Sequence, residues 1–214
     1  MQRHRSPCSL LAAALALLAW AQPAGAQLTV ATQEAMRGLS RALFYDPATR
    51  QRFGEILVDY GAPVWKADYG DLDAFRGQRL RLGAGEWASL TCEVPMTIGD
   101  TPVAEGRYLL ALDCSAAGVW SLVLLDAARV ERDDLPPWDP ARTKALGVTI
   151  ELTQQTAASP SPRLAVRIEG SDPKAMLLSL TFGPHQLVVP LAERIPRSGS
   201  PDAAGGSPVR RGGG

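Results

Sequence analysis

Histidine and net charge are both scarce in this 214-residue sequence. His4 and His185 are its two histidines, and 22 basic residues balance 22 acidic ones. Zinc centres are built from several histidine or cysteine ligands, so the histidine count excludes multi-histidine sites, and we expect no metal or other cofactor. Nucleic-acid binding needs a clustered excess of Lys and Arg, so we expect no nucleic-acid partner.

Long hydrophobic runs are lacking as well. The run Leu10–Trp20 has about 11 residues, fewer than the ~20 that a membrane-spanning helix needs. Arg3 and Arg5 precede it and Ala24-Gly25-Ala26 follows it, which is the pattern of a secretory signal peptide. We therefore predict cleavage after Ala26, a periplasmic or secreted protein, and no membrane span after signal removal. A transmembrane anchor is the alternative, and the short run argues against it.

Cysteine is also rare, with three in the chain, of which Cys8 lies in the predicted signal peptide. Cys92 and Cys114 are then an even pair in an oxidising compartment. If residues 99–106 connect two antiparallel strands, the register that keeps the apolar side chains on one face pairs Cys92 with Cys114. The sequence thus predicts a Cys92–Cys114 disulfide. The alternative is two reduced, buried cysteines that act as small hydrophobic residues.

What the sequence does contain is a repeated alternation of apolar and polar residues. This period of two is typical of β-strands, and the helical crossovers that a parallel sheet requires are missing. We predict an all-β fold, an antiparallel β-sandwich of about nine short strands, with a barrel as the alternative architecture. Turn residues separate the predicted strands, among them those at 99–100, 117–118, 159–162, 170–173 and 183–185.

The two ends of the chain differ from this pattern. Met36, Leu39 and Leu43 recur at helical spacing and predict a short N-terminal helix over Thr32–Phe44. From Pro196 onwards the sequence is rich in Gly, Pro and Ser and has no apolar periodicity. The predicted organisation is a signal peptide (1–26), the N-terminal helix and lead-in (27–52), a β-sandwich domain (53–195) and a disordered tail (196–214).

One connection and several aromatic residues are candidates for a binding role. Residues 126–145 form a long connection, which in a compact domain is often a lid or ligand loop; the alternative is that it covers an open end of the sandwich with Trp138. Trp87 is out of phase with Leu90 and Cys92, so we expect it to face away from them. Six aromatic residues can line a sugar- or peptide-binding face or belong to the core: Tyr60, Trp65, Tyr69, Trp87, Trp120 and Trp138.

Four segments resemble a known family. Residues 60–66 (Tyr-Gly-Ala-Pro-Val-Trp-Lys) resemble the "Y-x-x-P-x-x-K" element of the bacterial domain of unknown function 2911 (DUF2911), and residues 81–86 resemble its "W-R-x-G-A-N-E" element. Residues 103–108 are similar to its "v-P-A-G-x-Y" hairpin, and residues 120–124 to its "W-x-l-i-l" strand. The resemblance extends over residues 53–191 and implies a secreted, all-β protein without an established activity.

The resemblance and the residue pattern together suggest a site. In Arg79-Leu80-Arg81-Leu82, Arg81 points away from the face on which the leucines pack, and the glycines after it permit a bend. One hypothesis is that Arg81 and Lys66 receive an anionic or polar group beside Trp87, with Glu86 orienting Arg81; the other is an Arg81–Glu86 ion pair without a ligand. The candidate binding residues are Tyr60, Lys66, Arg81, Glu86 and Trp87.

No catalytic constellation stands out. His185 lies in a Gly-Pro-His turn, and the chain has no G-x-S-x-G element. Asp68, Asp71 and Asp73 lack EF-hand spacing, so a solvated acidic loop is expected. We predict a non-catalytic binding or interaction module whose partner is an unknown ligand or an envelope protein. The alternatives are an acid-dependent hydrolase or isomerase that uses the carboxylates of loops 68–73 and 133–139, and a structural envelope protein tethered by its tail.

Overall fold

The fold is an antiparallel β-sandwich, as the alternation predicts. The computed structural model describes residues 36–70 and 72–195, and eleven strands occur in these residues. The predicted signal peptide and C-terminal tail lie outside the described residues. Among the helices that the structure describes, none is long and apolar enough to cross a bilayer. The strands are β1 (Arg37–Tyr45), β2 (Arg52–Gly61), β3 (Gln78–Arg81), β4 (Ser89–Cys92), β5 (Met96–Ile98), β6 (Thr101–Val103), β7 (Gly106–Cys114), β8 (Trp120–Asp126), β9 (Gly147–Glu151), β10 (Thr153–Glu169) and β11 (Met176–Glu193).

Short helices connect some of the strands. The 3-10 helices η1 (Ala67–Tyr69) and η2 (Leu72–Phe75) lie between β2 and β3. The α-helices α1 (Ala127–Arg132) and α2 (Pro140–Thr143) and the 3-10 helix η3 (Lys144–Leu146) lie between β8 and β9.

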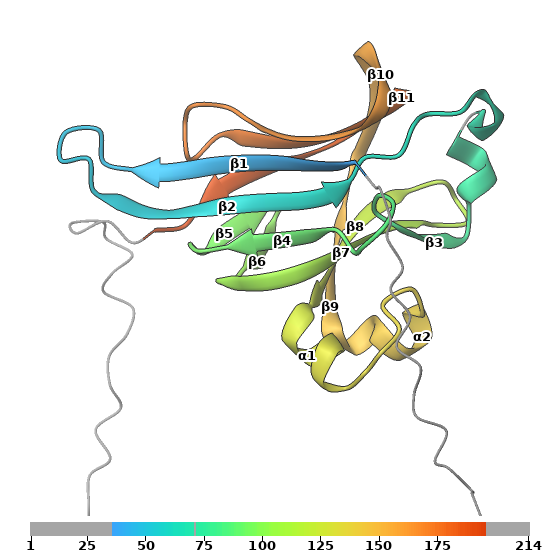
Figure 1. Ribbon diagram of the computed structural model, residues 1–214, viewed down its shortest axis with the longest axis horizontal. Coiled ribbons are helices and arrows are strands. Elements are labelled where there is room, and N and C mark those ends of the chain that lie inside the picture. The colour runs from blue at the N-terminus through green and yellow to red at the C-terminus, as the bar shows by residue number, and fades with distance from the viewer. Residues whose placement is uncertain (1–35, 71, 196–214) are drawn as a thin grey trace, which may run out of the picture. The chain divides into compact units, whose positions relative to one another are not determined.

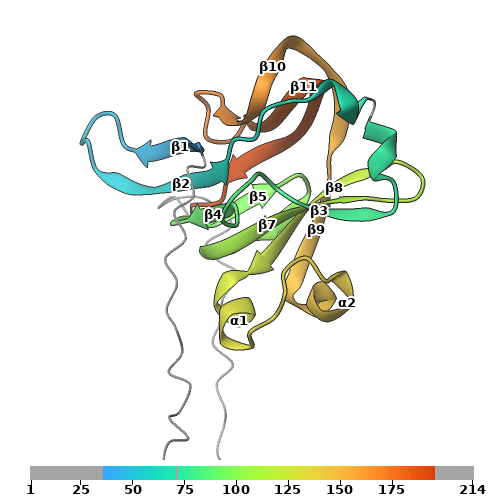
Figure 2. The same cartoon turned by 45° about the vertical axis from the view of Figure 1, so that its right-hand side comes forward.

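Two sheets enclose the core. Within the described chain the first sheet has the order β1-β2-β4-β7-β8-β9, with β3 also paired to β7, and the second has the order β10-β11-β5-β6 (Figures 1 and 2). Inward side chains of both sheets form one buried cluster, which includes Ile56, Leu90 and Leu122 from the first sheet and Ile98 and Leu178 from the second. The chain passes between the sheets from β4 to β5, from β6 to β7 and from β9 to β10.

The predicted N-terminal helix is wrong over the described residues, because Arg37–Tyr45 is strand β1, paired with β2. Three of its four inward positions, Gly38, Ser40 and Ala42, carry small residues, and a side chain at Gly38 would overlap the Tyr60 ring. The large side chains that suggested a helix face solvent instead, with Leu39 70% and Leu43 48% exposed. The sandwich therefore begins in β1 and not at residue 53.

Two predicted turns are also wrong. Residues 159–162 and 183–185 are bends inside β10 and β11, which have 17 and 18 residues. The β10–β11 register shifts on both sides of Ser161, and Gly183 has a φ of 59° beside the Trp65 ring. Strand β11 therefore occupies the place of two predicted short strands, and β10 extends the one strand predicted near residues 164–168 back through residues 159–162, whereas the turn at Gly99-Asp100 is confirmed.

The structure contradicts the predicted disulfide, because Cys92 and Cys114 are both free and buried. The turn at 99–100 pairs Ile98 with Thr101, and the β4–β7 register then places Cys92 opposite Gly106. Cys114 lies eight residues further along β7, about 27 Å at ~3.4 Å per strand residue. The prediction failed because it treated residues 99–106 as the loop, whereas the hairpin turn has two residues and residues 101–103 form β6.

We expect both thiols to be reduced and protected in the native protein. Burial raises the pKa of Cys92 to about 12, which leaves about one thiolate in ten thousand at pH 8. Native protein should therefore resist alkylation at this position, and the rate should rise with pH. Intact mass after iodoacetamide treatment, with and without urea, measures this. An increase in the intact mass on reduction would show that the two cysteines had been joined in a disulfide and would contradict the free-thiol arrangement.

Candidate functional site

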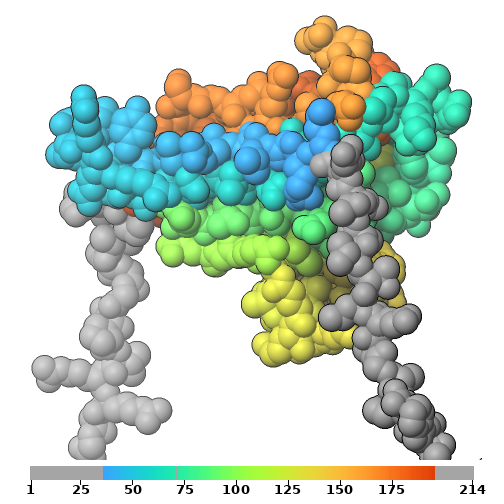
Figure 3. Space-filling model, in the orientation of Figure 1, coloured from blue at the N-terminus to red at the C-terminus, as the bar shows by residue number. Residues whose placement is uncertain are grey.

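The long connection after β8 covers the outer face of the first sheet. Asp126 begins α1 by accepting a hydrogen bond from the Arg129 amide at 3.1 Å, and Asp139 begins α2 by accepting one from the Ala141 amide at 2.9 Å. Side chains of α1 pack on the outer side of β7 and β8 in a second apolar cluster, which contains Leu109, Ala111, Val123, Leu125, Ala127 and Val130. The segment therefore lies on a sheet face (Figure 2) and stands out from the strands in the space-filling view (Figure 3).

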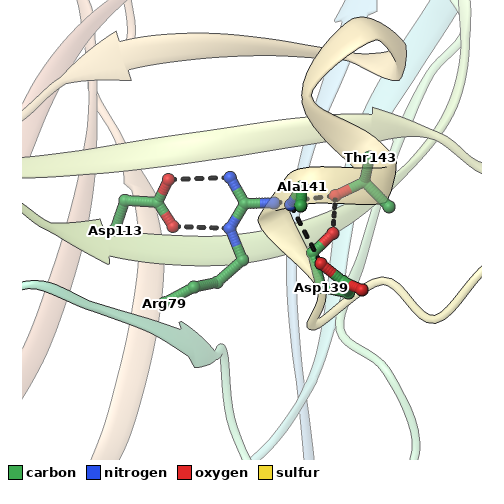
Figure 4. Close-up of polar contacts among 5 residues, drawn as sticks. All are labelled: Arg79, Asp113, Asp139, Ala141 and Thr143. Carbon is green, nitrogen blue, oxygen red and sulfur yellow. Dashed lines mark hydrogen bonds and ion pairs between the residues drawn. The ribbon is translucent and has the colours of Figure 1, made fainter.

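A bidentate ion pair ties this segment to the sheet. The Arg79 Nε and Nη2 donate to the two carboxylate oxygens of Asp113 at 2.6 and 2.7 Å (Figure 4). The third guanidinium nitrogen donates to the Thr143 hydroxyl at 2.9 Å, and this hydroxyl donates to the Asp139 carbonyl at 2.8 Å. The Arg79 side chain is only 7% exposed. Because β3 supplies Arg79 and α2 supplies Thr143, the network fixes α2 relative to the sheet.

Two tryptophans stack beside this anchored segment. The rings of Trp87 and Trp138 are nearly parallel, with 10° between their planes and 6.2 Å between their centroids. The guanidinium carbon of Arg81 lies 5.8 Å from the Trp87 ring centroid, a cation–π arrangement. Trp87 is half-buried and Trp138 is 62% exposed. We call Arg81, Trp87 and Trp138 the tryptophan surface.

The structure brings together two of the five candidate binding residues. Arg81 and Trp87 are in contact, and Trp87 packs on the outer cluster, away from Leu90 and Cys92 as its position in the sequence predicts. Tyr60 is buried in the sandwich core, while Lys66 and Glu86 are exposed. No ion pair joins Arg81 to Glu86 among the residues that the structure describes, so the ion-pair hypothesis is not supported.

The two segments that carry these candidates lie side by side. A side chain at Gly61 would overlap the Ala84 carbonyl oxygen, and one at Gly83 would approach the Gly61 carbonyl oxygen to 2.5 Å. Gly83 also has a φ of 88°, in the left-handed region that glycine tolerates. The bend expected after Arg81 therefore exists, and it is made by backbone packed on backbone.

Three carboxylates of the proposed hydrolytic loops, those of Asp73, Asp133 and Asp139, have structural roles. Asp139 caps α2, and Asp73 forms an ion pair with Arg76 at 2.6 Å. A hydrogen bond from Arg132 lowers the pKa of Asp133, whereas a general acid needs a raised one. Asp71 lies outside the described residues, and within them no three His, Cys, Asp or Glu side chains gather as metal ligands would. The geometry therefore gives the hydrolase hypothesis no support.

His185 has a packing role. Its Nε2 lies 3.4 Å from the Gly70 carbonyl oxygen, and its ring centroid lies 5.5 Å from that of Trp65. Trp65 also contacts Phe182 edge-on at 4.9 Å and Tyr69 at 5.5 Å. These rings form an aromatic cluster between the β2–β3 connection and β11.

The stacking of Trp138 on Trp87 is not among the features predicted from the sequence. A local signal was available, since Asp139-Pro140 is the cap-and-proline start of a helix and Trp138 immediately precedes it. That signal predicts α2, but the contact between rings 51 positions apart depends on where the segment folds.

The resemblance to DUF2911 stays a prediction, and the site described above rests on its own geometry. Comparison of the chain with protein-family models, with curated proteins and with solved structures finds no match.

Proposed function

We propose that this protein is a non-catalytic binding module of the periplasm or cell exterior and that the tryptophan surface binds its ligand. The observation that carries the proposal is the stack of Trp87 and the exposed Trp138 beside Arg81. A ring as large as indole is usually more buried than Trp138 is, and exposed aromatic groups often mark interaction sites. The predicted signal peptide supports the location. The loop carboxylates that cap a helix or form ion pairs support a role without catalysis.

The surface is rigid enough to recognise a ligand. Trp87 is supported from below by the outer apolar cluster, and the segment that carries Trp138 is fixed through Thr143 and Arg79. Binding to preorganised groups loses little conformational entropy, so such a surface binds more tightly than the same residues on a loose loop.

The chemistry of the surface favours a carbohydrate that carries carboxylates. The exposed ring of Trp138 offers a flat apolar face to the C–H side of a sugar ring. The Arg81 side chain has no hydrogen-bond partner among the described residues, so its N–H groups are available to a carboxylate. An acidic oligosaccharide satisfies both groups together.

We expect Trp138→Ala to weaken binding of oligogalacturonate about tenfold, which corresponds to ~1.4 kcal/mol of lost stacking. Titration followed by tryptophan fluorescence and by calorimetry measures the change. Arg81→Ala should remove the preference for oligogalacturonate over a neutral cello-oligosaccharide.

The matched control is Tyr45→Ala, which removes another exposed aromatic side chain, 60% exposed on β1. This variant should bind as the wild type does. Equal binding by wild type and Trp138→Ala would refute the proposed site, and so would the absence of binding to either oligosaccharide.

A further inference from the structure

A cavity of about 130 Å³ lies between the two sheets, at the end where residues 62–77 connect β2 to β3. Both sheets and η2 contribute to its wall. Its lining is almost wholly apolar and includes Leu72, Phe75, Leu80, Leu112, Trp120 and Leu180. Arg81 and His185 alone carry ionisable side chains among the described lining residues.

This end of the core is open to solvent. Five apolar residues of the lining pack on the core cluster and yet are only half-buried, namely Leu72, Phe75, Leu80, Leu112 and Phe182. Towards the other end, Ile56, Met96 and Ile98 are almost completely buried. The helices η1 and η2 bury none of their residues, so the cavity is covered loosely and a small molecule can reach it.

We infer that this cavity binds a small, uncharged aromatic molecule about the size of benzene or toluene. A cavity of about 150 Å³ lined by Leu, Ile and Phe stays dry and takes benzene, and the cavity here is close to that size and chemistry. Phe75 and Trp120 meet edge to face at 6.3 Å, so the wall offers ring edges and faces to an aromatic guest. The inference goes beyond the proposed function, because it concerns another site and another ligand.

An ionised guest does not fit this wall. A charge that enters an apolar cavity loses its hydration, which is unfavourable unless a charged or hydrogen-bonding partner replaces the water. Among the described lining residues His185 can supply such a partner, whereas the Arg81 guanidinium lies over the Trp87 ring on the outer face of the sheet. Toluene and benzoate, which share a ring and differ in charge, therefore distinguish an apolar cavity from an anion site.

The experiment is thermal unfolding of the full chain with toluene or benzoate. Toluene at several times its dissociation constant should raise the unfolding midpoint saturably, by about 3 °C. The variant Leu112→Phe adds bulk to the cavity wall and should abolish the shift. Leu39→Phe is the matched control, because the same change at an exposed position of β1 should leave the shift intact.

Should Leu112→Phe fail to fold, Leu72→Phe gives a second test from η2, where the residue is half-buried. Methyl NMR shifts of the wild type on toluene addition should be confined to the lining leucines. The inference is overturned if toluene gives no saturable shift, if the filled variant responds like the wild type, or if benzoate binds more tightly than toluene. Oligogalacturonate binding is read out separately, so failure here leaves the proposed function unchanged.

Discussion

Gly61→Ala is expected to lose a large fraction of the stability of the native fold. A methyl group at this position would overlap the Ala84 carbonyl oxygen, and its neighbours there are backbone atoms that cannot rotate away. Over-packing by one methyl group commonly costs 1–3 kcal/mol, and a clash with backbone belongs at or above the upper end, about 3 kcal/mol. Native domains are stable by about 5–15 kcal/mol, so this is a large fraction of the total. Urea unfolding followed by circular dichroism measures it.

Gly77→Ala is the matched control. Gly77 has a φ of 73°, and a side chain there would meet nothing within 4 Å, so the change tests left-handed strain without a clash. It should cost about 1 kcal/mol. Gly83→Ala combines a close approach to Gly61 with a φ of 88° and should be at least as damaging as Gly61→Ala. If Gly61→Ala unfolds at the same urea concentration as Gly77→Ala, the two segments do not pack backbone on backbone.

The sandwich itself could be predicted because burial between two sheets requires alternation, which is readable in one sequence. The lengths of β10 and β11 could not be predicted from turn residues. Pro160 and Pro162 suggest a turn, but β10 is an edge strand. Proline has no N–H group to donate, and an edge strand tolerates it because one side of the strand has no neighbouring strand to receive that hydrogen bond. The irregular register around Ser161 absorbs these prolines, so the strand continues through them.

Cys92 and Cys114 show why a correctly read alternation of apolar and polar residues does not determine which residues of two strands pair. Alternation keeps Cys92 and Cys114 on inward positions, and both are indeed buried in the core. Many registers preserve that alternation, and the turn chooses among them. Here the Gly99-Asp100 turn places β5 and β6 in the second sheet, while β4 and β7 remain in the first. The alternation of apolar residues does not reveal that a hairpin between two strands of one sheet belongs to the other sheet.

The candidate site was predictable in its local part only. The alternation around Arg81 and the phase of Trp87 gave the correct direction of both side chains, because neighbours along a strand determine that direction. Trp138 completes the surface from a distant segment. Its position depends on the Arg79 network and on packing of α1, which are tertiary contacts.

Arg79→Met is expected to lower stability by about 2 kcal/mol, or roughly 6 °C in the unfolding midpoint. The substitution leaves the Asp113 carboxylate and the Thr143 hydroxyl without their guanidinium partner. Removing one member of a fully buried pair costs 3–5 kcal/mol, and the lower value reflects the 32% exposure of Asp113, which lets water replace part of the interaction.

The double variant Arg79→Met/Asp113→Leu distinguishes the cost of an unpaired carboxylate from the cost of lost packing by the Arg79 side chain. If the loss arises from an unpaired carboxylate, replacing the carboxylate as well should recover much of it, and the double variant should lose less than the sum of the single ones. Arg107→Met is the control. It breaks the exposed Arg107–Glu131 pair, which also links the sheet to the helical segment, and should cost under about 0.5 kcal/mol.

The Arg79 network has a consequence for the tryptophan surface that stability alone does not reveal. If the network holds α2, Arg79→Met should also disturb the stacked rings of Trp87 and Trp138 at temperatures where the protein is still folded. The circular-dichroism couplet of two close indoles and the Trp138→Ala fluorescence difference report on this stack. Oligogalacturonate binding should fall together with the couplet in Arg79→Met and recover with it in the double variant. An unchanged couplet in a destabilised Arg79→Met protein would show that the apolar packing of α1 alone positions Trp138.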